Sequence, residues 1–252
     1  MRKMLLYPIG ATSACSFACD FLNKNGIQMI DHPSPDVTHV LLDIPSFGLD
    51  GQLRGGGDLQ LILEMLPPDI TLIGGNLSKD LVMDYCTIDL LQDPDYLALN
   101  AAITADCALK VAAPLLKTTF AESDTIIIGW GRIGKCLSML LKNIGIHVTI
   151  AARKISDRAT IRALGFDALD IVDIPQALPS CKLLFNTVPE RILSQEQLNK
   201  HPGCIKIELA STAGIECEDV VIARGLPGSY APISSGRLIA ETILKRCKED
   251  LK

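Results

Sequence analysis

The stretch TIIIGWGRIGKCLSMLLKNIGIHVTIAARK, residues 125–154, joins a short apolar run, three glycines and a closing basic pair. The apolar run 125–128 predicts a buried strand, and the apolar periodicity after it predicts a helix. Between them, Gly129, Gly131 and Gly134 give the spacing G-x-G-x-x-G. In a dinucleotide site these glycines allow a tight turn, close approach of the pyrophosphate and close packing of helix on strand. The stretch therefore predicts dinucleotide binding; the alternative is a glycine-rich turn without a ligand.

The basic pair at the end of the second predicted strand indicates which dinucleotide. In NAD sites, an Asp or Glu about twenty residues after the first glycine accepts hydrogen bonds from the ribose 2′-hydroxyl. Here the sequence has Ala151, Ala152, Arg153 and Lys154. A guanidinium suits a phosphate, so we predict NADP, with NAD as the second choice. The alternative is that Arg153 and Lys154 belong to a solvated loop.

Composition limits the partners and the compartment. The net charge is −5, and no Lys/Arg block is present, so we expect neither a nucleic-acid nor a membrane partner. The N-terminal apolar run reaches Pro8 too soon for a secretory signal, and we expect no apolar run to approach a membrane span. The nine cysteines are scattered without C-x-x-C, which favours reduced thiols, no metal site and a cytoplasmic protein.

Strands and helices alternate along the chain, which predicts an α/β fold with parallel sheets. Residues 1–93 are predicted to form a small flavodoxin-like α/β domain on the substrate side. Its expected strands are 4–8, 27–31, 38–44, 70–74 and 86–91, with helices near 12–24 and 57–66. Residues 94–117 are expected to form an interdomain helix that Pro114 ends or kinks.

Residues 118–235 are predicted to form a doubly wound NAD(P)-binding Rossmann domain. Its further strands are expected at 147–151, 168–172, 182–187, 205–210 and about 226–231. A last helix is expected to begin at a serine cap in SSGRLIAETIL and, over 236–252, to pack back on the first domain.

Several motifs of the second half resemble a known family. They are IIIGWGRIG, LALNAAITADCAL (97–109), LLFNTVPERILSQEQL (183–198), IELASTAG (207–214) and RGLPGSYAPISSGRLIAETIL (224–244). Over residues 95–248 the chain resembles the A subunit of dipicolinate synthase. Residues 1–90 match only in architecture and are shorter than in that family. Where the family follows its Leu-Ala-Ser with Arg-Pro, this chain has Ser211, Thr212 and Ala213.

The resemblance implies an NADP-dependent oxidoreductase subunit of sporulation. Its reaction would convert a dihydrodipicolinate-type precursor, a small dicarboxylate, into pyridine-2,6-dicarboxylate. It further implies that the partner is a flavoprotein-like B subunit, and we allow for a homo-oligomer.

The expected cofactor residues lie in the glycine loop and at the ends of the strands, where ligands of open α/β sheets bind. They are Gly129, Gly131, Arg132, Ile133, Gly134, Arg153, Lys154, Asn186, Thr187, Val188, Pro189 and Ser211. Helix capping is an equally good interpretation of Thr187 and Ser211 taken singly.

The expected catalytic and substrate residues come from topology and resemblance. The catalytic candidates are Asn100, Thr104, Asp106 and Ser211, and the substrate candidates are Gly75, Asn76, Ser234, Ser235 and Arg237. None of the four histidines is placed to act with a carboxylate as the acid and base of a 2-hydroxyacid dehydrogenase, and each is expected to be a structural or exposed side chain. Because loss of hydride from a dihydropyridine gives an aromatic ring, orientation can matter more than a strong base.

Two other hypotheses stay open. The chain could be a NAD(P)-binding sensor or scaffold without turnover, which an assay of hydride transfer would distinguish. Chemistry like that of S-adenosylhomocysteine hydrolase is disfavoured by the basic pair and by the lack of suitably placed His and Lys residues.

Overall fold

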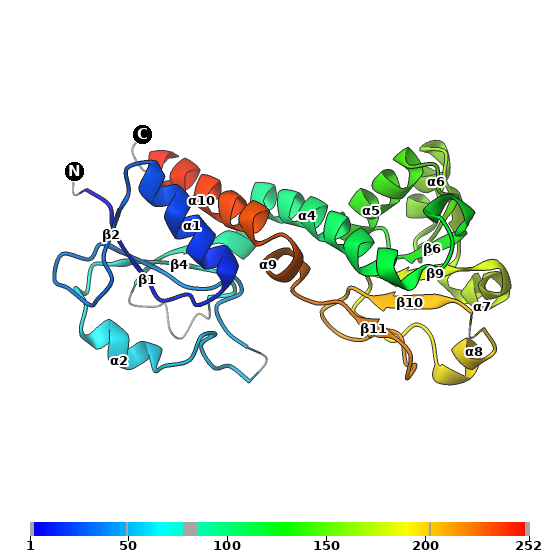
Figure 1. Ribbon diagram of the computed structural model, residues 1–252, viewed down its shortest axis with the longest axis horizontal. Helices are drawn as coiled ribbons and strands as arrows, with labels where there is room; N and C mark the ends of the chain where they lie inside the picture. The colour runs from blue at the N-terminus through cyan, green and yellow to red at the C-terminus, as the bar shows by residue number, and fades with distance from the viewer. Residues whose placement is uncertain (1–2, 49, 78–84, 202, 250–252) are drawn as a thin grey trace. The chain divides into compact units, whose positions relative to one another are not determined.

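The chain divides into two compact units in a computed structural model, which describes residues 3–48, 50–77, 85–201 and 203–249 (Figure 1). Unit 1 takes in residues 1–100 and 227–252, and unit 2 takes in residues 101–226. The first boundary falls inside the helix that we expected between the domains, and the second falls before residue 235.

Unit 1 contains a parallel five-stranded sheet in the order β2-β1-β3-β4-β5. Numbered along the chain this is 2-1-3-4-5, the flavodoxin-like order, so that part of the predicted fold class is confirmed. The strands are β1 (Leu5–Pro8), β2 (Gln28–Met29), β3 (His39–Leu41), β4 (Thr71–Gly74) and β5 (Cys86–Asp89). Each lies within a predicted strand and is shorter than predicted, because pairing covers only part of each apolar run.

In the described part of unit 1, helices α1 (Ser13–Lys24) and α2 (Leu59–Glu64) follow β1 and β3, and α10 (Pro232–Glu249) lies near the C-terminus. A 3-10 turn, η1 (Leu90–Gln92), follows β5. Helices α1 and α10 lie side by side (Figure 1). At Gly236 a Cβ atom would lie 2.6 Å from the Ala14 carbonyl oxygen, so glycine permits this close crossing.

Unit 2 contains a parallel six-stranded sheet in the order β11-β10-β9-β6-β7-β8. Strands β7 and β8 lie on one side of β6, and β9, β10 and β11 lie on the other. This is the doubly wound order of dinucleotide-binding domains, so the predicted Rossmann sheet is confirmed. The strands are β6 (Thr125–Ile128), β7 (Val148–Ala151), β8 (Asp167–Leu169), β9 (Leu183–Asn186), β10 (Ile205–Glu208) and β11 (Val221–Ile222). All residues of β6 and β9 are buried, as expected for central strands covered on both faces.

Helical segments connect these strands. They are α5 (Arg132–Asn143), α6 (Ile155–Ala163), α7 (Ile174–Ala177) and α8 (Gln195–Asn199), with 3-10 turns η4 (Ile171–Asp173) and η5 (Leu178–Ser180). Two further 3-10 turns, η2 (Ala113–Leu115) and η3 (Phe120–Glu122), precede β6. Leu137 and Leu141 of α5 are fully buried, which explains the apolar periodicity after the glycines.

Helix α4 (Pro94–Ala112) carries the chain from unit 1 into unit 2. By length and composition, Pro94–Leu115 is apolar enough to cross a membrane, which corrects the expectation that no segment approaches that limit. The core helix of a soluble protein meets the same test, and Ala105 and Ala108 are fully buried. Length and composition alone are therefore weak evidence for a membrane span here.

Two features near the C-terminus differ from the prediction. Residues 226–231 were expected to form a strand, but Leu226–Tyr230 form the short helix α9, and the edge strand β11 lies earlier, at Val221–Ile222. The last helix begins at Pro232, so the expected cap residues Ser234 and Ser235 lie inside its first turn. Proline suits the first turn of a helix, where its missing N–H costs nothing.

Candidate functional site

The glycine loop of unit 2 is shaped by packing at two of its three glycines. Gly129 has φ +106°, and a Cβ atom there would lie 2.4 Å from Thr187 Oγ1. At Gly134 a Cβ atom would lie 2.3 Å from the Gly129 carbonyl oxygen. The first and third glycines are therefore required by the fold itself, through the tight turn and the close contact of α5 with β6.

Gly131 is different, because no protein atom requires it to be glycine. It has φ −80°, which suits any residue, and a Cβ atom there would meet nothing within 4 Å. Gly131 is also the N-cap of α5, and no side chain caps that helix. The helix thus presents uncapped N–H groups and the positive end of its dipole beside an open position. This combination fits the pyrophosphate of a dinucleotide.

Two further residues predicted for the cofactor begin α5. Arg132, its first residue, is exposed beside this helix end, and Ile133 is half-buried. The guanidinium of Arg132 can therefore reach an anion at the N-terminus of the helix.

The basic pair follows β7, as expected, but Arg153 has an acidic partner. The exposed guanidinium of Arg153 forms an ion pair with Glu190, from the loop after β9. The Arg153 backbone is also held in place, since Arg158 Nη1 donates to the carbonyl oxygens of Ala152 and Arg153 at 2.7 Å each. Lys154 is exposed and precedes α6.

The carboxyl ends of β9 and β10 are joined by a buried polar pair. Asn186 and Glu208 are both fully buried, and Asn186 Nδ2 donates to the two Glu208 carboxylate oxygens at 2.9 and 3.0 Å. The Glu208 carboxylate also accepts N–H bonds from Ala210, Gly214 and Ile215, at 2.8–3.1 Å. The side chain of Asn186, which we predicted to contact the cofactor, therefore holds two loops in place.

Of the other cofactor residues predicted in these loops, some form hydrogen bonds within the protein and others are exposed. Thr187 Oγ1 donates to the Ile128 carbonyl oxygen at 2.8 Å, and the Val188 N–H donates to Asn186 Oδ1 at 3.0 Å. Pro189 and Ser211 are exposed. The structure therefore brings the loops after β6, β9 and β10 together at one edge of the sheet.

The catalytic candidates on α4 differ in their exposure. Asn100 is half-buried, Thr104 is buried and Asp106 is exposed. Burial raises the pKa of the Cys136 thiol on α5, and the charge of Asp106 raises it further, so Asp106 lies near α5. Asn100 belongs to unit 1 and the other two to unit 2.

The substrate candidates lie in unit 1. The N–H of Gly75 donates to Ser46 Oγ at 3.0 Å, and exposed Asn76 has φ +55° with its N–H donated to Asp89 Oδ1 at 3.2 Å. Ser234 and Arg237 are exposed on α10, and Ser235 is buried. Gly75 and Asn76 thus follow β4 in a turn that neighbouring side chains hold.

Sequence reasoning missed the acids that organise these edges. Asp43, buried after β3, accepts N–H bonds from Ala11 and Thr12 at 2.9 and 3.0 Å, and a hydroxyl bond from Thr12 at 2.5 Å. Asp89 and Glu208 hold other loops in the same way. A single acid at the end of an apolar run, as in LLD and IKIE, is the only signal the sequence offers for Asp43 and Glu208.

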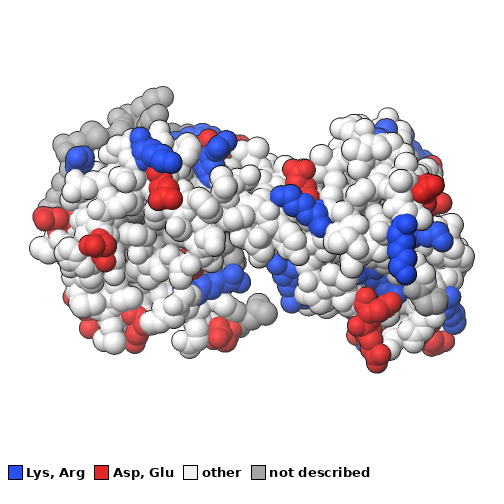
Figure 2. Space-filling model, in the orientation of Figure 1, with Lys and Arg blue, Asp and Glu red and all other residues white. Residues whose placement is uncertain are grey.

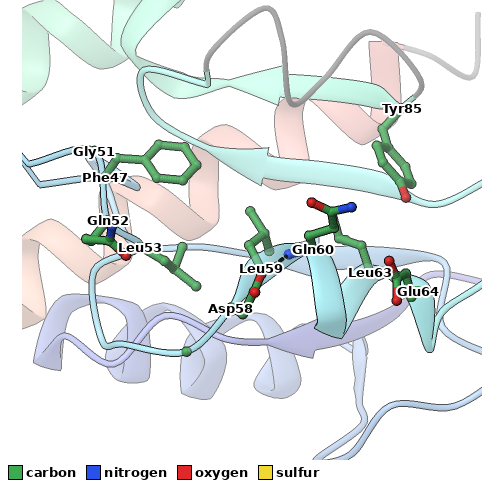
Figure 3. A pocket seen from close by; sticks show the side chains of 11 residues that line it. Phe47, Gly51, Gln52, Leu53, Asp58, Leu59, Gln60, Leu63, Glu64 and Tyr85 are labelled. Atoms are coloured by element: carbon green, nitrogen blue, oxygen red, sulfur yellow. Dashed lines mark hydrogen bonds between the residues drawn. The ribbon is translucent and has the colours of Figure 1, made fainter.

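Unit 1 also contains an open cavity of about 770 Å³ that none of the predicted residues lines. Phe47 and Tyr85 stand on two sides of it, and Leu59 and Leu63 of α2 lie between them (Figure 3). Acidic and amide side chains, among them Asp58 and Gln60, also line it. The Asp58 carboxylate is already used to cap α2, accepting the Gln60 N–H at 2.9 Å.

Charged side chains and free thiols occur in both units of the chain. On the face shown in Figure 2, basic and acidic side chains are interspersed over each unit. All nine cysteines are free thiols, and the described residues contain no group of three or more His, Cys, Asp or Glu that could hold a metal.

The comparisons with known proteins agree with this geometry. No protein-family model matches the chain. The A subunit of dipicolinate synthase of Bacillus subtilis (strain 168) is 24% identical over 174 residues, which cover 64% of this chain and 58% of that protein. The match therefore takes in less than two thirds of that relative's length. The solved structure of the A subunit of dipicolinate synthase from Bacillus halodurans superposes with a TM-score of 0.81 at 20% identity, covering 96% of this chain and 97% of the other.

The chain resembles the A subunit of dipicolinate synthase in sequence and in fold. The resemblance predicted from the motifs of the second half is thus confirmed.

Dehydrogenases share the fold of this dipicolinate synthase-like chain. An L-alanine dehydrogenase superposes with a TM-score of 0.67 at 13% identity, covering 97% of this chain and 80% of the other. The NAD-complexed D-isomer specific 2-hydroxyacid dehydrogenase from Lactobacillus delbrueckii ssp. bulgaricus does so at 0.56 and 12%, covering 98% and 97%. These likenesses show that the chain shares the fold of these dehydrogenases.

Proposed function

We propose that this chain is an NADP-dependent oxidoreductase subunit that forms pyridine-2,6-dicarboxylate from a dihydrodipicolinate-type precursor. The name shared by its relatives, the A subunit of dipicolinate synthase, supports the substrate class. The dehydrogenase fold supports the reaction type. NADP is favoured over NAD because Arg153 and Lys154 follow β7 where an NAD site carries an acid.

Gly131 is the observation that carries the proposal. No packing contact within the protein requires a glycine at this position, because an added Cβ atom would project into open space. The residue stands at the N-terminus of α5, which no side chain caps. A ligand whose oxygens come close to the backbone here would require a residue without a side chain.

The chain's own residues would bind and orient the cofactor in three places. The N–H groups at the start of α5, with Arg132, would hold the pyrophosphate, while Arg153 and Lys154 would hold a 2′-phosphate. The Asn186–Glu208 pair would keep the loops of Thr187–Pro189 and Ser211 in position at the sheet edge. A bound nicotinamide would supply the hydride acceptor.

The reaction balances without a further oxidant. The dihydropyridine ring of the substrate loses a hydride to the cofactor and a proton to a base or to water, and becomes aromatic. For the two carboxylates, the chain offers Arg237, Arg132 and the N-terminus of α10 as donors, with Gly75, Asn76, Ser234 and Ser235 as further candidates. Asn100, Thr104, Asp106 and Ser211 remain the proposed polar residues for proton handling.

The proposed partners follow from the same resemblance. We propose a small dicarboxylate as the substrate and a dipicolinate synthase B-type flavoprotein subunit as the protein partner. Self-association into a homo-oligomer is compatible with this proposal. A cytoplasmic location without membrane or nucleic-acid partner completes this proposal.

The test is an assay of turnover with product identification. The dihydrodipicolinate-type precursor is supplied with NADP, with and without a B subunit, and NADPH absorbance is followed. We expect NADPH and pyridine-2,6-dicarboxylate in equal amounts. If neither mixture forms them while the protein binds NADP, the chain is a dinucleotide-binding sensor or scaffold instead.

A further inference from the structure

Resting on the proposed function, a second inference concerns how unit 2 chooses its cofactor. We infer that Glu190 is a specificity-determining residue: its carboxylate competes with the 2′-phosphate of NADP for Arg153. The acid that is missing after β7 is thus supplied by a different loop of the same sheet.

The strand order places Glu190 across the glycine loop from Arg153. In the sheet, β6 lies between β9 and β7. Glu190 follows β9, Arg153 follows β7, and the glycines follow β6 in the middle. The ion pair between Glu190 and Arg153 therefore spans the carboxyl ends of β9, β6 and β7, where proteins of this fold bind a dinucleotide.

The backbone of Glu190 is held firmly, although its side chain is exposed. On one side, Asn186 Nδ2 donates to the Val188 carbonyl oxygen at 2.9 Å. On the other, the Ile192 N–H donates to the Gly214 carbonyl oxygen at 2.8 Å. A Cβ atom at Gly214 would lie 2.3 Å from the Glu190 carbonyl oxygen, so these segments are in close contact. The loop therefore fixes the backbone from which the Glu190 side chain extends, and the carboxylate itself meets Arg153 in the ion pair.

The next residue, Arg191, ties the same loop to the other side. Its guanidinium forms an ion pair with Glu216, which follows β10. The two successive residues thus point to opposite neighbours. This arrangement makes Arg153 the partner of Glu190 and leaves Arg191 engaged elsewhere.

The two cofactors differ in how they meet this pair. A 2′-phosphate must take Arg153 from Glu190 and then lie close to the carboxylate, which repels it. A ribose 2′-hydroxyl can instead donate a hydrogen bond to a carboxylate, as it does in NAD sites. Glu190 should therefore reduce the preference for NADP that Arg153 and Lys154 create.

The experiment measures dissociation constants of NADPH and NADH for the full chain, by fluorescence titration at about 0.1 M salt, where exposed charges still interact over roughly 10 Å. The variants are Glu190→Gln, Arg153→Ala and the double variant. Glu196→Gln is the matched control, because Glu196 also forms an exposed ion pair, with Lys200, but lies on α8. Thermal unfolding confirms that each variant is folded.

We expect Glu190→Gln to bind NADPH about three- to tenfold more tightly, as for one exposed like-charge contact, with NADH unchanged or weaker. The gain should shrink when Arg153 is already alanine, and Glu196→Gln should have no effect. An unchanged NADPH-to-NADH ratio in Glu190→Gln, or an equal gain in Glu196→Gln, would overturn the inference alone. If the unaltered chain binds neither cofactor, the proposed function fails with it.

Discussion

Replacing Gly131 by alanine should strongly weaken cofactor binding while leaving the fold intact. The added Cβ atom meets no protein atom within 4 Å, and φ −80° suits alanine. Alanine gains about 0.4–1 kcal/mol by restricting the unfolded chain. It loses a similar amount, roughly 0.5–1 kcal/mol, as a poorer N-cap than glycine. These effects cancel, so the free energy of unfolding should change by less than about 1 kcal/mol.

The effect on binding should be larger, because the methyl group occupies the space through which the pyrophosphate reaches the backbone. Losing one charge-assisted hydrogen bond costs about 1.5–3 kcal/mol, or about ten- to 150-fold in the dissociation constant. Calorimetric titration with NADPH measures the binding, and urea unfolding measures the stability.

Two matched variants sharpen this test. At Gly203 an added Cβ atom also meets nothing within 4 Å, so Gly203→Ala should bind normally. Gly134→Ala should lose both stability and binding, because its Cβ atom would lie 2.3 Å from the Gly129 carbonyl oxygen. Normal NADPH affinity in Gly131→Ala, or an unfolded Gly131→Ala protein, would refute the reasoning.

Three further predictions concern charged side chains of unit 2. Arg153→Ala should weaken NADPH binding by about 1.5–3 kcal/mol with little change for NADH; equal losses in the two titrations would count against a 2′-phosphate site. Hydrogen bonding to Asp167 at 2.8 Å, with the charges of Asp167 and Asp124, raises the pKa of His147 above its usual 6.5. The stabilisation that protonated His147 gives the fold should therefore be complete below pH 6.5 and be lost as pH rises through the raised pKa. Urea midpoints of wild type and His147→Gln should converge at high pH, and a gap that stays constant with pH would contradict this. Asp219→Asn should lower the free energy of unfolding by about 1–3 kcal/mol, because it leaves the buried Lys206 ammonium, 2.7 Å from Asp219, without its charged partner. Lys206→Met should cost less, because the Asp219 carboxylate that it leaves behind is half exposed. Equal urea midpoints for the two variants would speak against the pair.

The sheets could be predicted from the sequence because local patterns decide them. The buried run before Gly129 and the apolar stripe after Gly134 need no distant partner to be recognised. Strand ends were placed too far out, since an apolar run often continues beyond the last paired residue. The sequence does not distinguish a strand from a helix at 226–231, because Pro227 fixes a φ value that suits both an extended segment and the first turn of a helix, and the structure has the helix α9 there.

The site could be predicted less completely, because its key partners meet only in the folded sheet. Asn186 stands where a ligand contact is expected, but its side chain points to Glu208, 22 residues later. Glu190 reaches Arg153 across 37 residues, and no spacing in the sequence reveals that pair. The glycines, by contrast, act through their own backbone and could be assigned from the motif.

The most direct test of the central claim is a calorimetric titration of the purified chain with NADPH and, separately, NADH. The account predicts one binding site per chain for both cofactors, with NADPH bound more tightly, and a large loss of affinity for both in Gly131→Ala. Absence of binding to either cofactor at millimolar concentration, by a protein shown to be folded, would contradict it.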